Sequence, residues 1–171
     1  ARIVLARFHA ESPMHPLSIQ ANLLYAKTLT QTAYYEAATT LLEDLLKRRD
    51  ARGRPHAEAL LALSENSDLA GKTKRAVPYA QRVYNVYRAY PEISARAYLM
   101  SARQLEKLGE LQAAHRTLKE MLSNERICQL PLAGEAINLL SKLEQDLIEE
   151  AGVATAINNS TVTGGVEEPQ K

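Results

Sequence analysis

The sequence repeats itself at a spacing of 38 residues, and this feature restricts the possible folds more than any other. Alanine recurs at positions 38, 76 and 114. Three further rows keep the spacing and a shared residue type: Ala26, Ser64 and Ala102; Ala33, Gly71 and Gly109; Leu45, Val83 and Met121. A fixed period of this length indicates a stacked array of one supersecondary unit. Such arrays are elongated and present an extended surface to other molecules.

Each unit is predicted to contain two helices joined by a tight turn. We number the unit so that Ile19, Ala57 and Ala95 occupy position 1. Apolar residues then recur three and four positions apart, as on one face of a helix. Position 15 holds alanine or glycine, and glycine suits the left-handed backbone at the end of a helix. A second helix follows with alanine at position 20, where a small side chain lets two helices approach closely.

The repeats are flanked by segments of different character. Residues 1–12 are predicted to be the trailing helix of a truncated repeat, because the chain opens in the middle of the apolar pattern. Residues 13–151 are assigned to three repeats and a C-terminal capping helix, in which Leu140, Leu143 and Leu147 share one face. The pattern ends at Gly152, so residues 152–171 are predicted to be a flexible tail.

Composition argues against several classes of protein. Lys plus Arg number 21 and Asp plus Glu number 20, so the net charge of +1 gives no indication of nucleic-acid binding. The one cysteine, Cys128, allows no internal disulfide and no zinc site built from cysteines, and we interpret it as buried or semi-buried. No segment approaches the roughly 18 apolar residues of a membrane helix, so direct membrane insertion is not expected.

The arrangement resembles the tetratricopeptide repeat (TPR) family. The third unit carries the resemblance through Tyr98, Ala102, Leu105, Gly109, Leu111, Ala114, Leu118 and Met121. The resemblance implies an all-α, right-handed solenoid of antiparallel helix pairs that acts as a non-catalytic scaffold or adaptor. The period of 38 exceeds the 34 usual in the family. Residues 8–13 and 90–95 resemble the unit junctions of longer-period TPRs in bacterial cell-envelope proteins, which favours the periplasm over the cytoplasm without fixing the compartment.

In TPR proteins the first helices line a concave groove, chiefly through positions 2, 5, 9, 12 and 13. The resemblance implies that a partner protein or peptide contacts the matching residues here: Leu23, Lys27, Leu61, Glu65, Arg96, Leu99, Arg103 and, on the cap, Ile137. Such a groove suits an extended peptide or an amphipathic helix. The alternative is that its leucines pack against neighbouring helices and never face water. Leu99→Asp is predicted to abolish binding without unfolding the chain.

A basic segment separates the first unit from the second. Its residues Arg48, Arg49, Arg52 and Arg54 are candidates for contact with phosphate, acidic lipid or an acidic partner. The alternative is a solvated loop, because cations are also favoured at the C-terminus of a helix. The tyrosines of the second unit are interpreted as packing between repeats.

No catalytic, metal or cofactor site is predicted. The four histidines lie on different elements without the spacing of metal ligands, and neither a glycine-rich phosphate loop nor a Gly-x-Ser-x-Gly elbow is present. The chain is therefore predicted not to be an enzyme. Two alternatives stay open: a regulatory or positioning TPR segment of a larger enzyme, and self-association through the ends of the repeat array.

Overall fold

The protein is all-α in a computed structural model that describes residues 2–12, 15 and 17–162. No β-strand occurs within these residues. The longer helices are α1 (Arg2–Glu11), α2 (Ser18–Gln31), α3 (Tyr35–Lys47), α4 (Arg54–Leu69), α5 (Thr73–Val86), α6 (Pro91–Lys107), α7 (Leu111–Ser123) and α9 (Leu132–Val162). Two short segments, η1 (Arg49–Ala51) and α8 (Glu125–Cys128), follow α3 and α7.

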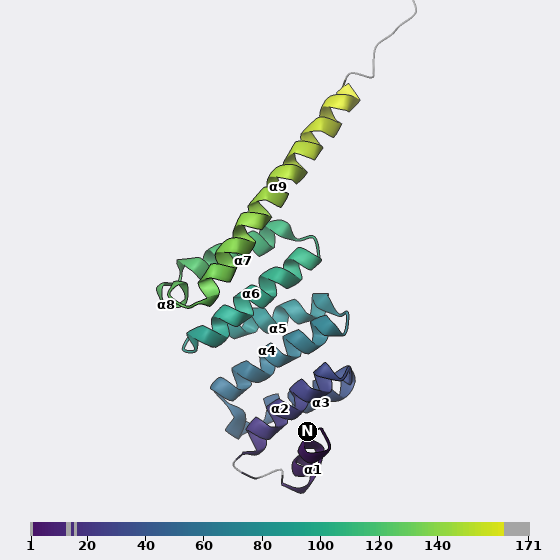
Figure 1. The fold of residues 1–171 in the computed structure, drawn as a ribbon, viewed down its shortest axis with the longest axis vertical. Coiled ribbons are helices and arrows are strands. Elements are labelled where there is room, and N and C mark those ends of the chain that lie inside the picture. Colours follow the sequence, from purple (N-terminus) through teal and green to yellow (C-terminus); the bar gives the residue numbers. More distant parts are fainter. Residues whose placement is uncertain (1, 13–14, 16, 163–171) are drawn as a thin grey trace, which may run out of the picture.

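Neighbouring helices pack in a row, so the chain forms a helical repeat-like structure (Figure 1). Each helix from α2 to α7 contacts the one before it and the one after it, and α9 packs on α7. In addition α2 contacts α4, α4 contacts α6, and α6 contacts α9. These four helices therefore form one continuous layer. We call it the inner layer, and α3, α5 and α7 cover its other side.

The repeat spacing found in the sequence returns in the backbone. Helices α3, α5 and α7 begin at residues 35, 73 and 111, which are 38 apart. The turn before each helix contains one residue with positive φ: Ala33 at 61°, Gly71 at 74° and Gly109 at 76°. Position 15 therefore ends the first helix of each unit in a left-handed conformation, as the sequence pattern predicts.

Three positions of the second helix are buried to the same extent in every unit. The alanines at position 20, Ala38, Ala76 and Ala114, are all fully buried. Buried residues also occupy positions 24 and 27 of every unit: Leu42, Ala80 and Leu118, then Leu45, Val83 and Met121. A methyl group at position 20 leaves room for the paired helix to approach. Larger side chains one and two turns later fill the space between helices, except at Ala80 in the second unit.

Buried polar side chains join one unit to the next. The Asn66 amide accepts a hydrogen bond from Thr30 Oγ1 at 2.8 Å and donates to Thr39 Oγ1 at 2.9 Å and the Tyr35 carbonyl at 3.0 Å. The amide of Gln104, one unit later, donates to Ser64 Oγ at 2.9 Å. These bonds fix how the units sit on each other, because a shifted contact would leave buried polar groups unpaired.

The last helix is longer than the sequence pattern predicts. Helix α9 extends to Val162, so residues 152–162, which the sequence assigns to a flexible tail, are helical. Gly152 alone weakens a helix by only about 1 kcal/mol, and no proline follows before Pro169. The rest of the expected tail, residues 163–171, lies outside the described part of the chain.

Candidate functional site

The residues predicted for the groove meet on the inner layer. Side chains from α2, α4 and α6 surround a depression of about 180 Å³. Its lining consists of Leu23, Lys27, Thr30, Gln31, Glu58, Leu61, Ala62, Glu65 and Arg96. We call this depression the first hollow. All of its residues except Ala62 stand at unit positions 2, 5, 9, 12 or 13, which the 3.6-residue turn of an α-helix places on one side.

A second hollow continues along the same layer. It measures about 350 Å³ and lies between α6 and the start of α9. Its lining consists of Asp68, Arg96, Leu99, Met100, Arg103, Lys107, Leu132 and Glu135. Arg96 lines both hollows, so they adjoin at this side chain. Ile137 is exposed over 53% of its surface on α9, but it lines neither hollow.

The leucines at position 5 are largely enclosed by neighbouring helices. Leu61 and Leu99 keep only 2% and 3% of their surface exposed, whereas Leu23 is half-buried. The packing alternative therefore applies to Leu61 and Leu99, which border the hollows only with their edges. The burial of Leu99 argues against the prediction that Leu99→Asp leaves the fold intact, because a carboxylate at this position would be largely removed from water.

Ion pairs between helices occupy most of the charges in the second hollow. Lys107 Nζ lies 2.6 Å from Asp68 Oδ2, and Arg103 lies 2.9 Å from Glu135 Oε2. Just beyond them, Lys142 Nζ lies 2.6 Å from Glu106 Oε1, and the hydrogen bond to this carboxylate raises the pKa of Lys142. Each pair connects two adjacent helices of the inner layer. These charges therefore bind one another across the units and are not free to pair with a ligand.

The first hollow has a different electrostatic character. Lys27, Glu65 and Arg96 are exposed, and none forms an ion pair with another residue that the structure describes. Glu58, by contrast, pairs with Arg54 at 2.9 Å. The first hollow therefore presents two free cations and one free anion above the apolar side chains of Leu23 and Ala62.

The basic segment between the first two units is partly neutralised. Arg48 pairs with Asp50 at 2.6 Å and donates to Ser18 Oγ at 3.0 Å, and the Arg48 guanidinium lowers the pKa of Asp50. Arg54 is held by Glu58. Arg49 and Arg52 are exposed and have no ion pair within residues 2–12, 15 and 17–162. Arg48 and Arg54 thus bind carboxylates of the chain itself, while Arg49 and Arg52 face solvent. This arrangement agrees with the alternative of a solvated loop.

The remaining candidates for chemistry are dispersed. No group of three or more His, Cys, Asp or Glu residues that could hold a metal ion occurs in the described residues. Within the same residues, no helix has the length and apolar character needed to cross a membrane. Cys128 is exposed, so its interpretation as buried or semi-buried is wrong. Its neighbour Ile127 fills the core position instead, with 1% of its surface exposed.

Comparison with protein families, curated proteins and solved structures finds no match to this chain. The assignment of a function therefore rests on the geometry of its own residues. Sequence reasoning overlooked one part of that geometry. A separate cavity, lined in part by Arg88 and Arg126, lies where α5, α6, α7 and α8 meet.

Proposed function

We propose that the chain is a TPR-like solenoid whose inner layer binds a segment of a partner protein. The observation that carries the proposal is the lining of the two hollows. Residues that the repeat numbering places at equivalent positions of α2, α4 and α6 come together on one surface, with an apolar floor and charged walls. A surface of this kind suits a peptide that extends across several helices or an amphipathic helix lying along the layer.

The burial of the floor limits the affinity of such a complex. Because Leu61 and Leu99 are already packed, a partner gains apolar contacts chiefly with half-buried side chains such as Leu23 and Met100. Each well-buried partner side chain contributes about 1.5–3 kcal/mol, while association costs about 4–15 kcal/mol. We therefore expect micromolar binding, in which the free charges of the first hollow select the partner sequence.

Selection of displayed random peptides on the immobilised protein, followed by titration of the selected peptides, tests this proposal. Lys27→Glu and Arg96→Glu each reverse a free charge in the first hollow, and we expect each to weaken binding at least tenfold. Lys119→Glu on the exposed side of α7 is the matched control and should leave the affinity unchanged. Lys27→Glu and Arg96→Glu should weaken binding without a change in thermal stability, because both residues are exposed.

The decisive comparison is between the peptide affinities of the inner-layer variants and that of the control variant, Lys119→Glu. Peptides that bind the Arg96→Glu and Lys119→Glu proteins equally well would place their site elsewhere and contradict the proposal. Failure to select any peptide with a dissociation constant below about 1 mM, which corresponds to about 4 kcal/mol of binding free energy, would contradict it as well.

Self-association through the ends of the array is a second proposal, which a specific observation favours. Helix α1 exposes Ile3 and Val4 over 81% and 70% of their surfaces. Burial of these side chains by a second copy would remove apolar surface from water at about 25 cal/mol per Å². Sedimentation equilibrium should detect dimers that are weakened by Ile3→Ser with Val4→Ser. A monomer at high protein concentration would argue against this proposal.

A further inference from the structure

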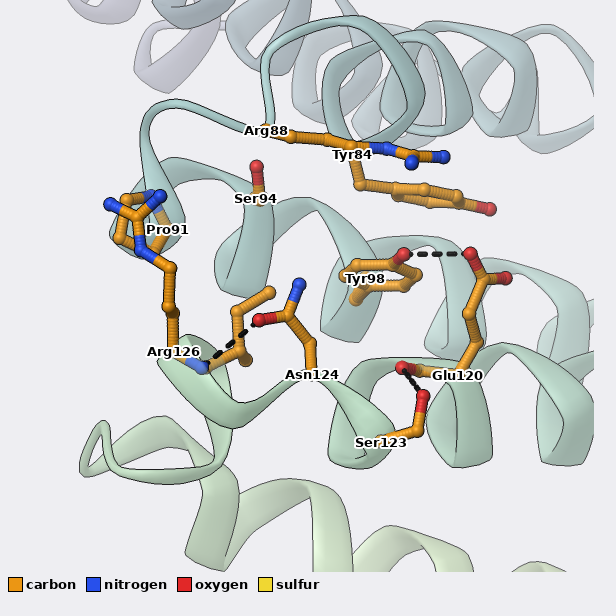
Figure 2. A pocket seen from close by; sticks show the side chains of 10 residues that line it. Tyr84, Arg88, Pro91, Ser94, Tyr98, Glu120, Ser123, Asn124 and Arg126 are labelled. Carbon is orange, nitrogen blue, oxygen red and sulfur yellow. Dashed lines mark hydrogen bonds between the residues drawn. The ribbon is translucent and has the colours of Figure 1, made fainter.

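A cavity of about 250 Å³ lies on another side of the molecule, at the junction of the second and third units (Figure 2). The ends of α5 and α7, the start of α6 and the short helix α8 surround it. Its lining consists of Tyr84, Arg88, Pro91, Ser94, Tyr98, Glu120, Ser123, Asn124, Arg126 and Ile127. We call it the junction cavity. Its volume suits one side chain or a small organic molecule.

Helix α6 separates the junction cavity from the hollows of the inner layer. Ser94 and Tyr98 face the cavity, whereas Arg96, Leu99 and Arg103 line the hollows. At about 100° of rotation per residue, these two sets point to opposite sides of the helix. A ligand in the junction cavity would therefore not occupy the surface proposed for the partner protein.

The buried wall of the cavity is aromatic. The rings of Tyr84 and Tyr98 stack with their centroids 3.9 Å apart and an interplanar angle of 11°, and both residues are buried. Burial raises the pKa of both phenols, which favours their neutral form. The Tyr98 hydroxyl donates to Glu120 Oε1 at 2.9 Å (Figure 2), which gives the one carboxylate of the lining a partner inside the protein.

The two arginines of the lining have no such partner. Arg88 and Arg126 are both exposed, and neither guanidinium forms an ion pair or a hydrogen bond with any residue in the described part of the chain. The two residues stand 38 positions apart, one repeat spacing. In Figure 2, Arg88 lies on the Tyr84 side of the cavity and Arg126 on the Pro91 side.

Asn124 adds a third donor of known orientation. Its Oδ1 accepts a hydrogen bond from the Arg126 backbone N–H at 3.1 Å, so its Nδ2 group keeps both hydrogens available. The hydroxyl of Ser123 donates to the Glu120 carbonyl at 2.8 Å, and that of Ser94 donates to the Tyr87 carbonyl at 3.3 Å. Two guanidinium groups and the Asn124 amide are thus donors of the lining without an acceptor in the described part of the chain.

We propose that the junction cavity binds an oxyanion, either a carboxylate or a phosphate group, carried by a small ligand. A ligand that supplies acceptors can replace the water around these exposed donors, and guanidinium groups bind carboxylate and phosphate through paired hydrogen bonds. The lining has two cations, Arg88 and Arg126, and one carboxylate, Glu120, which already accepts a hydrogen bond from Tyr98. Its net charge therefore favours an anion. The stacked tyrosines and Ile127 provide an apolar wall for the body of the ligand.

Titration of the full chain with inorganic phosphate and, separately, with succinate tests the proposal. Both titrations are followed by NMR of the backbone amides at low ionic strength, where screening is weak. We expect saturable shifts at Asn124 and Arg126, with millimolar affinity for at least one of the two anions. Arg88→Gln and Arg126→Gln should each weaken this binding about tenfold, as expected for the loss of a charge-assisted hydrogen bond.

Arg75→Gln is the matched control, because it removes the same charge from the other end of α5. Binding only of phosphate or only of succinate identifies the oxyanion and supports the proposal. Shifts that do not saturate with either anion, or binding that Arg75→Gln weakens as much as Arg88→Gln, would overturn it. Unchanged circular dichroism of the variants separates a loss of binding from a loss of fold.

Discussion

Replacement of Ala33 by glycine should stabilise the protein. Ala33 is the one non-glycine residue with positive φ among the residues that the structure describes, at 61°. The equivalent turns of the next two units use Gly71 and Gly109 at 74° and 76°. The three helical hairpins therefore provide an internal comparison, in which the same backbone conformation is formed once with a Cβ atom and twice without it.

The size of the effect follows from two opposing terms. A left-handed conformation costs an L-residue about 1–2 kcal/mol. Glycine loses about 0.4–1 kcal/mol more conformational free energy on folding than alanine does. The difference predicts that Ala33→Gly raises the free energy of unfolding by about 0.5–1 kcal/mol, and that Gly71→Ala and Gly109→Ala lower it by a similar amount. A Cβ atom at residue 71 or 109 would meet no atom within 4 Å, so no steric clash adds to these values.

Urea unfolding followed by far-UV circular dichroism measures all three variants against the wild type. We expect the midpoint to rise for Ala33→Gly and to fall for the other two, with melting temperatures that change by about 2–4 °C per kcal/mol. Destabilisation by Ala33→Gly would contradict this prediction, and so would neutral effects of both Gly71→Ala and Gly109→Ala. Either result would mean that position 15 does not need a left-handed residue to end the first helix.

Three further predictions concern the core and the titration of His56. Leu99→Ala should lower the free energy of unfolding by about 2–5 kcal/mol in urea, and Leu99→Asp by more. Asn66→Ala should cost about 1–3 kcal/mol, because the hydroxyl of Thr30 and the carbonyl of Tyr35 lose a buried partner. Burial, with Arg82 and Arg52 nearby, lowers the pKa of His56 below its ordinary value of 6.5. The unfolded chain then binds the proton more tightly than the native state, so stability should fall as the pH falls through 6.5. Melting temperatures at neutral and mildly acidic pH should show that His56→Asn removes part of this dependence.

The turns and the helix pairing could be predicted from the sequence because each depends on one residue type at a fixed position. Only a small side chain fits at position 20, and the left-handed turn favours glycine at position 15. The end of α9 could not be predicted in the same way. Loss of the apolar pattern after Gly152 removes the sequence signal for packing, but it does not provide the proline or capping residue that would end the helix.

The sequence was less informative about the surface. A leucine at position 5 is required both by a groove and by packing between helices, so the burial of Leu61 and Leu99 could be learned only from the structure. The ion partners of Arg103 and Lys107 lie 32 and 39 residues away, and no local pattern predicts them. Arg88 and Arg126, in contrast, do share the repeat spacing. Alignment of the junctions as well as the helices would have placed them at equivalent positions.

The distribution of ion pairs divides the inner layer into two halves with different roles in the proposed complex. In the second hollow, Lys107 and Arg103 already have carboxylate partners. A ligand that contacts them must exchange one ion pair for another, so the gain in free energy is smaller than for a charge that has no partner in the free chain. In the first hollow, Lys27, Glu65 and Arg96 have no ion partner among the described residues, so each can form a new pair with the ligand. Selectivity for the partner should therefore depend on α2, α4 and the Arg96 side of α6, with the second hollow contributing mainly apolar contacts.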